Sequence, residues 1–295
     1  MLDRVLTQPR AKCRKVTLPD RLAALLVWTV ATLVAGMLLW IVLDLLRHGL
    51  PHLSIGFLLD APRDAGRAGG IAPVLVATAM ILIVSLAVAV PLGLATALLL
   101  SEYIRRGSRF AGFVRHALEV LAGVPSIVFG LFGNALFVRY FGMGYSVAAG
   151  GLTLACMVLP LFVRASEEAL RSVPDDFRRA ADALGLTRAA AIRSVLLPAA
   201  LPGILVALVL STGRALAEAA ALLFTSGYVL RVPESLGDSG RTLAVHIYEL
   251  AMNVPGGESQ AYATGVVLLG ALLLINLLTA LLGRRYGAQV QGVRR

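Results

Sequence analysis

Long apolar runs alternate with short polar segments along most of the chain. Six of these runs are long enough for a helix to cross a bilayer, which takes about 20 residues. They lie near 22–44, 72–99, 117–138, 146–166, 199–224 and 262–282. Backbone in lipid has to satisfy its hydrogen bonds within its own segment, so each run predicts a helix. The pattern therefore predicts an all-α integral membrane protein, a bundle of six transmembrane helices.

The polar segments divide the chain into three parts. Residues 1–21 form a basic N-terminal tail, 22–283 form the transmembrane domain, and 284–295 form a C-terminal tail. Within the domain, the connection between the fifth and sixth runs is long, and its stretch 243–252 predicts an amphipathic interfacial helix. The composition agrees with this division, because 58% of the residues are apolar and only 15% are charged.

The charge distribution orients the bundle. The net charge of +10 on its own would suggest nucleic acid as a partner. With the N-terminus inside, however, 20 Lys and Arg residues fall on the inner side and 6 on the outer side, and Arg214 is the remaining one of 27. This split follows the positive-inside rule. We therefore expect a multi-pass protein of a bacterial inner membrane with both termini in the cytoplasm, in contact with lipid and not with nucleic acid.

The inner loop between the fourth and fifth runs, 172–203, predicts two short helices. Pro174 suits a first helical position, Gly185 suits a left-handed helix end, and Thr187 can cap the second helix. Pro198 and Pro202 then mark the return to the membrane. One face of the first helix is apolar, and such a face favours docking into the groove of a partner. The residues expected on this face are Phe177, Ala180, Ala181 and Leu184.

The fifth run carries two charges near its middle, Arg214 and Glu218. A charge at the centre of a bilayer costs at least roughly 2.5–3.5 kcal/mol, so both should face a polar cavity or each other. Four residues apart, they are expected to share one helix face. A guanidinium presents a planar fork that matches an oxyanion, and Glu218 can restrain it when no anion is bound. The alternative is a structural ion pair between helices.

The segment GVPSIVFGLFG at 123–133 is the second candidate for a substrate pathway. Pro125 interrupts helix hydrogen bonding, and Gly123, Gly130 and Gly133 permit close backbone approach. Ser126 offers a hydroxyl to the pathway. Close helix packing is the alternative explanation for each of these residues.

The sequence lacks the motifs of several enzyme classes. It contains no G-x-x-x-x-G-K-[ST] phosphate loop, no Ser–His–Asp set and no carboxylate dyad. Two cysteines do not make a metal site, and the four histidines, which show no paired ligand spacing, are expected to be solvated loop residues. We expect neither an enzyme nor a chain that binds a metal or a cofactor. Any ATP must be hydrolysed by another polypeptide.

The inner loop resembles a signature of ABC importer permeases, E-A-A-x3-G-x9-I-x-L-P. The spacing fits throughout, with Arg179 in place of the glutamate and Val195 in place of the isoleucine. In that family the loop supplies the coupling helix that contacts the ATPase subunit. The residues matched to the signature are Arg179, Ala180, Ala181, Gly185, Val195, Leu197 and Pro198.

About 250 residues also resemble the A subunits of phosphate-specific transport (Pst) permeases. The most telling pieces are GVPSIVFGLFG and GRALAEAAALLFT at 213–225, in which Ala217 and Ala219 replace a glycine and a threonine of the family pattern. The resemblance implies import of inorganic phosphate with a homologous C-type permease, two ATPase subunits that use ATP-Mg, and an external phosphate-binding protein. A permease for another oxyanion or a phosphonate is the alternative within this class, and a secondary transporter is the alternative outside it.

Overall fold

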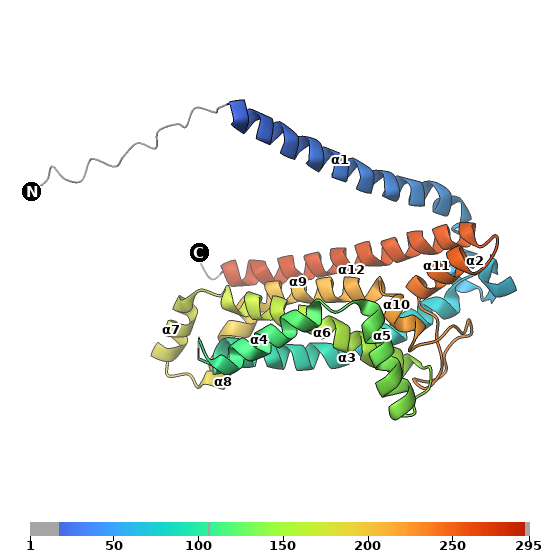
Figure 1. The fold of residues 1–295 in the computed structure, drawn as a ribbon. Helices are drawn as coiled ribbons and strands as arrows, with labels where there is room; N and C mark the ends of the chain where they lie inside the picture. The colour runs from blue at the N-terminus through green and yellow to red at the C-terminus, as the bar shows by residue number, and fades with distance from the viewer. Residues whose placement is uncertain (1–17, 106, 293–295) are drawn as a thin grey trace, which may run out of the picture. The chain divides into compact units, whose positions relative to one another are not determined.

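A computed structural model describes residues 18–105 and 107–292, so the expected tail 1–21 lies almost entirely outside the described residues. The chain is mostly helical (Figure 1). The α-helices are α1 Leu18–Gly49, α2 Ile55–Leu59, α3 Ala72–Leu98, α4 Arg109–Ala122, α5 Ser126–Gly133, α6 Val147–Arg171, α7 Asp175–Ala183, α8 Arg188–Ala191, α9 Leu197–Leu216, α10 Ala220–Leu223, α11 Leu243–Met252 and α12 Glu258–Gly292. Short 3₁₀ helices η1 Leu50–His52 and η2 Asp64–Gly66, π-helices η3 Leu99–Tyr103, η4 Asn134–Tyr140 and η5 Ile192–Leu196, and strands β1 Pro62–Arg63 and β2 Ala68–Gly69 complete it.

Within the described residues, five helices are long and apolar enough to cross a membrane, and one bent pair can form a sixth crossing. This confirms the predicted all-α bundle. The third span is not a single helix over 117–138, however. Arg109–Ala122 and Ser126–Tyr140 meet at an angle of 99°. Pro125 adopts an extended conformation (φ −59°, ψ 142°) just before α5. The helix before the bend does not continue through Pro125, because proline has no N–H for a helical bond and disfavours helical geometry in the residue before it.

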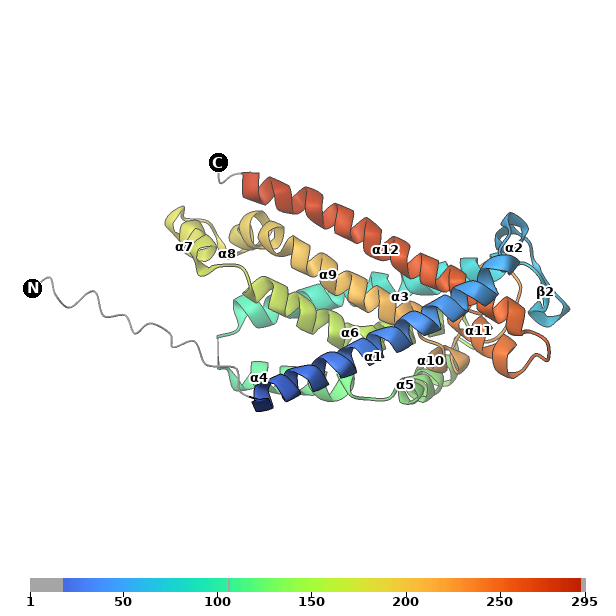
Figure 2. The same cartoon turned by 90° about the horizontal axis from the view of Figure 1, so that it is seen from above.

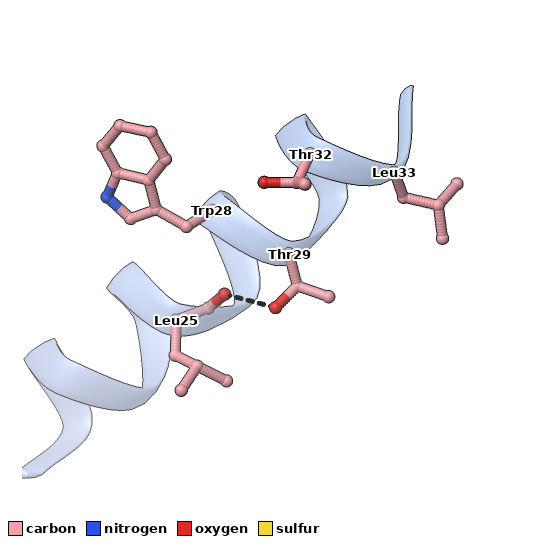
Figure 3. A pocket seen from close by; sticks show the side chains of 5 residues that line it. All are labelled: Leu25, Trp28, Thr29, Thr32 and Leu33. Atoms are coloured by element: carbon pink, nitrogen blue, oxygen red, sulfur yellow. Dashed lines mark hydrogen bonds between the residues drawn. The ribbon is translucent and has the colours of Figure 1, made fainter. Parts of the chain in front are cut away.

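The described part divides into two compact units, of which the first ends at Arg47. In this unit α1 is a single apolar helix, long enough to cross a membrane. Figure 3 shows a shallow groove on this helix, lined by Leu25, Trp28, Thr29, Thr32 and Leu33. The Thr29 hydroxyl donates to the Leu25 carbonyl within the helix (2.8 Å).

In the second unit, His48–Arg295, helices α3, α6, α9 and α12 run alongside one another (Figures 1 and 2). Buried side chains of α3, α6 and α9 form the two largest apolar clusters. Small residues allow the helices to approach closely. A Cβ built on Gly151 of α6 would lie 2.5 Å from a methyl carbon of Val84 in α3, and one on Gly203 of α9 would lie 2.6 Å from Cβ of Ala169 in α6.

Different elements gather at the two ends of these four helices. Helices α7 and α8 lie at one end, and α2 and α11 lie at the other (Figures 1 and 2). The predicted helix at 243–252 is confirmed as α11, although its residues Leu243–His246 are buried and so form part of the core. Helix α12 continues to Gly292, so it extends into the segment 284–295 that the sequence analysis expects as the C-terminal tail.

Candidate functional site

The fifth span is broken at the candidate charged residues. Helix α9 ends at Leu216 and α10 begins at Ala220, so Arg214 and Glu218 do not share one continuous helix face as predicted. Arg214 lies exposed in the last turn of α9, and Glu218 lies half-buried in the break. Among the residues that the structure describes, no ion pair joins the two side chains.

Glu218 has a different role from the expected one. Its Oε1 accepts the backbone N–H of Ala221 (3.1 Å), while its own N–H donates to the Ala215 carbonyl (3.3 Å). The carboxylate thus satisfies a backbone donor that the interrupted helix leaves free, as a helix cap does. The arginine is left available for another anion, whereas the acid stabilises the break.

The two most distinctive sequence segments, 123–133 and 213–225, meet in space. A Cβ built on Gly130 of α5 would lie 2.9 Å from the Cα of Ala221, so only glycine allows α5 and α10 to approach this closely. One turn further, Nδ2 of Asn134 donates to the Phe224 carbonyl (2.7 Å). The sequence analysis did not single out Asn134, although a polar amide next to Gly133 in an apolar run was an available signal.

Ser126 is the first residue of α5 and is half-buried, directly after the turn Gly123–Pro125. The hypothesis of close packing holds for Gly133, where a Cβ would lie 2.1 Å from Oγ1 of Thr153 in α6. It does not hold for Gly123, whose nearest such contact would be a carbonyl at 3.5 Å. The structure thus gives Gly130 and Gly133 packing roles and leaves the role of Ser126 a prediction.

At the end of the bundle that holds α11, the structure buries a histidine and an arginine, His246 and Arg241. His246 is 0% exposed, so the expectation of a solvated loop histidine is wrong for this residue. Arg241 is 9% exposed; its Nε donates to the Tyr228 carbonyl (3.0 Å), and its Nη1 lies 3.5 Å from Nδ1 of His246. An arginine only donates, so Nδ1 is the unprotonated nitrogen. Burial, followed by the neighbouring Arg241 cation, lowers the pKa of His246 to about 4.

The inner loop forms the predicted glycine corner. Gly185 has φ +67°, a left-handed conformation that glycine adopts without steric penalty. Its N–H donates to the Asp182 carbonyl (3.0 Å), and the next N–H, from Leu186, donates to Ala181 (3.1 Å), which completes a Schellman ending for α7. Thr187 caps α8 through its hydroxyl, which accepts the Ala190 N–H (3.3 Å). Both helix-end predictions are confirmed.

Two details of this loop differ from the prediction. Pro174 is the residue before α7 and not its first helical residue. The second helix does not end before the membrane, because α8, η5 and α9 form one helix from Arg188 to Leu216. A widened π turn carries the chain through Val195 and runs directly into α9 at Leu197. Pro198 lacks an N–H for the regular helical bond, and it lies next to a turn that already departs from this bonding, so it does not end the helix.

The apolar face predicted for α7 is divided by the fold. Ala181 is buried and Phe177 is half-buried against the bundle, whereas Arg179, Ala180 and Leu184 are exposed. The exposed part is the surface that remains for a partner.

The apolar helices define an integral membrane protein that carries a separate helix pair, α7 and α8, at one end of its bundle. The sequence matches binding-protein-dependent transport system inner membrane components over residues 89–288, and the chain belongs to this family. The predicted family is thereby confirmed. The chain is an inner-membrane permease subunit of an ABC importer, in which a separate partner subunit hydrolyses ATP.

Relatives match most of the chain. It is similar to the probable ABC transporter permease protein YqgI of Bacillus subtilis (strain 168), with 33% identity over 92% of this chain and 96% of that protein. It is also similar to the phosphate transport system permease protein PstA of Yersinia pestis, with 33% identity over 86% of each. The phosphate transport system permease protein PstA 1 of Mycobacterium tuberculosis (strain CDC 1551 / Oshkosh) is 37% identical over 73% of this chain and 71% of that protein.

Solved structures share the fold. A bacterial ABC transporter involved in the import of the acidic polysaccharide alginate matches with a TM-score of 0.58 at 15% identity, over 88% of this chain and 96% of that chain. The MetNI methionine ABC transporter in an inward-facing conformation matches with a TM-score of 0.55 at 19% identity, over 74% and 94%.

Proposed function

We propose that this permease subunit imports inorganic phosphate, and that Arg214 is the residue that binds the anion on its way through the membrane. The observation that carries this proposal is the exposed guanidinium at the end of α9, in a segment bridged by Gly130 and Asn134 to the other distinctive motif. Relatives named as phosphate transport system permeases support the choice of substrate.

Arg214 is exposed on the isolated chain, so its guanidinium can contact an anion or a neighbouring subunit. A cation that faced lipid at this depth would be strongly unfavourable, so the surface around Arg214 requires a polar neighbour. We assign that neighbour to the pathway formed with a second permease subunit, homologous and of the C type. There the planar fork of the guanidinium can bind two oxygens of a tetrahedral anion. Ser126, at the start of α5, contributes a hydroxyl to the same pathway.

In this proposal Glu218 acts through the backbone. By capping α10, its carboxylate holds open the break that ends α9, and the last turn of α9 then presents Arg214 beside the interruption. A broken helix that lines a cavity is a recurrent way to build a substrate site at membrane depth. The anion must bind strongly enough to enter and weakly enough to leave, which fits an arginine without a permanent ion pair.

The remaining parts of the proposal concern partners and orientation. Both termini lie in the cytoplasm, and α7, with Arg179, Ala180 and Gly185, contacts one of two ATPase subunits there. The segments 45–71 and 225–261 face the external phosphate-binding protein. ATP binding closes the ATPase pair and displaces α7 and α8, and the bundle opens toward the binding protein. The excess of Lys and Arg on one side of the spans supports this orientation.

The test is uptake into vesicles that hold the complete importer. We expect Arg214→Ala to abolish phosphate uptake while the ATPase subunit still co-purifies, and Arg214→Lys to retain only a small part of it, because lysine keeps the charge without the fork. Competition by sulfate, molybdate and phosphonate identifies the substrate, which matters because Ala217 and Ala219 depart from the family pattern. Unimpaired uptake by Arg214→Ala would refute the role of this residue.

A further inference from the structure

The last turn of α3, the π-helix η3 at Leu99–Tyr103, is held by three arginines from three other elements. Arg115 of α4 donates through Nη2 to the Leu100 carbonyl (3.3 Å). Arg178 of α7 donates to the Glu102 carboxylate, and the guanidinium carbon of Arg188 of α8 lies 5.6 Å from the centre of the Tyr103 ring. Two of the three arginines belong to the helix pair that we assign to the ATPase partner.

Arg178 is the most completely bound of the three. It forms a two-pronged contact with Glu102, from Nη2 to Oε1 (2.7 Å) and from Nε to Oε2 (3.3 Å). Its other donors reach the carbonyls of Val173 (2.9 Å) and Leu170 (3.1 Å) and Oδ1 of Asp175 (3.2 Å). All five N–H groups of the guanidinium therefore have acceptors. One side chain connects α7 to the end of α6 and to the end of α3.

Helix α7 has little apolar packing against the bundle. Ala181 is its only buried residue, and Phe177 is half-buried against the apolar cluster. A cavity of about 260 Å³, lined by residues that include Glu102, Arg178, Asp182 and Arg188, separates α7 and α8 beside the pair. Apolar packing is therefore weak here, and the hydrogen bonds of Arg178 determine where α7 sits. The Glu102 side chain is 9% exposed and that of Arg178 is 23% exposed. Removing one partner of so enclosed a pair leaves a charge without compensation, which is strongly unfavourable.

These contacts imply two routes by which a displacement of the helix pair reaches the spans. The first is covalent, because α8 continues through η5 into α9 and residues 172–174 join α7 to the end of α6. The second has no covalent connection and runs from α7 through Arg178 and Glu102 directly to the end of α3. If the second route were absent, a force on α7 would reach α3 only indirectly, through the packing of α3 against α6.

We propose that the Glu102–Arg178 pair is the joint that makes α3 move together with α7, and that both are positioning residues for the coupling of ATP hydrolysis to transport. This proposal rests on the proposed contact between α7 and the ATPase subunit. Arg188, which lies over the Tyr103 ring, holds the same turn at the end of α3 to α8. The end of α3 is therefore connected to both helices of the pair, and the two routes move together.

The experiment uses the complete importer in proteoliposomes and measures phosphate uptake for each ATP hydrolysed. Glu102→Gln is nearly isosteric with the native residue, and Arg178→Lys keeps the charge but loses the fork. We expect each variant to lower this ratio about tenfold, and the double variant to be no worse than either single one, because the two residues act as a unit. Glu119→Gln is the matched control: Glu119 forms a half-exposed pair with Arg164 (3.2 Å) at the same end, and its ratio should stay unchanged.

A wild-type ratio in assembled Glu102→Gln importers would overturn the proposal. If the variants fail to assemble, a second measurement decides the question with the pair intact. Spin labels at the exposed positions Ala183 and Arg105, with both cysteines replaced, report the distance between α7 and the end of α3. We expect this distance to stay constant, within about 2 Å, between the nucleotide-free and ATP-bound states. A larger change would show that α7 moves without α3 and would refute the joint.

Discussion

Replacing His246 tests the burial of this residue beside Arg241. Burial and the nearby Arg241 cation lower the pKa of His246 from 6.5 to about 4. The unfolded chain therefore takes up a proton as the pH falls through 6.5, whereas the folded chain takes it up only near pH 4. Stability is fully present above about pH 6.5 and declines as the pH falls toward 4. With about 1.4 kcal/mol for each pKa unit, the loss is about 3 kcal/mol.

Thermal unfolding in detergent at several pH values between 7.5 and 4.5 measures this effect. A change of 3 kcal/mol corresponds to roughly 5–10 °C in Tm for a chain of this size. His246→Gln cannot take up the proton, so its Tm should fall less than that of the wild type by about this amount. His116→Gln is the control, because the side chain of His116 is 77% exposed. If His246→Gln and the wild type lose stability in parallel, the burial of His246 or its contact with Arg241 is wrong.

Two further predictions concern glycines. Gly133→Ala places a Cβ 2.1 Å from Oγ1 of Thr153, so it should lower the Tm and the yield of folded protein. Adding Thr153→Ala in the same chain should restore most of the lost Tm and yield. An unchanged Tm in the single Gly133→Ala variant would contradict the packing of α5 on α6. Gly185→Pro cannot keep φ +67° or donate to the Asp182 carbonyl, so uptake for each ATP hydrolysed should fall sharply. A normal ratio of uptake to ATP hydrolysis in Gly185→Pro would contradict the coupling role of the loop. A lowered ratio in Gly185→Pro together with a normal ratio in Glu102→Gln would refute only the proposed joint between α7 and α3.

Much of the fold could be predicted from hydropathy and end signals. The six apolar runs gave the spans, because the length of a helix that crosses a bilayer is set by the bilayer itself. Gly185 and Thr187 predicted both helix ends correctly, because the left-handed glycine and the hydroxyl cap act within a few residues of chain. The family signature was likewise readable, since it depends on spacing along the chain.

The break in the fifth span could not be predicted in this way. Residues 217–219 are Ala-Glu-Ala, good helix formers with no local reason to stop a helix. The interruption depends on contacts with α5, through Gly130 and Asn134, and on the cap that Glu218 provides. The spacing of four between Arg214 and Glu218 was therefore misleading. It places two residues on one face only in a continuous helix, and tertiary contacts end this helix between them.

The sequence alone determined the class of protein, its helices, the glycine corner of the inner loop and the unusual presence of a charge in an apolar run. These features follow from interactions between residues close in the chain or between the chain and its solvent. Only the tertiary structure decided which charges meet. It separated Arg214 from Glu218, joined Arg178 to Glu102 across 76 positions, and buried His246 beside Arg241. Pairing of this kind depends on where whole helices pack, and no local pattern of residues encodes that placement.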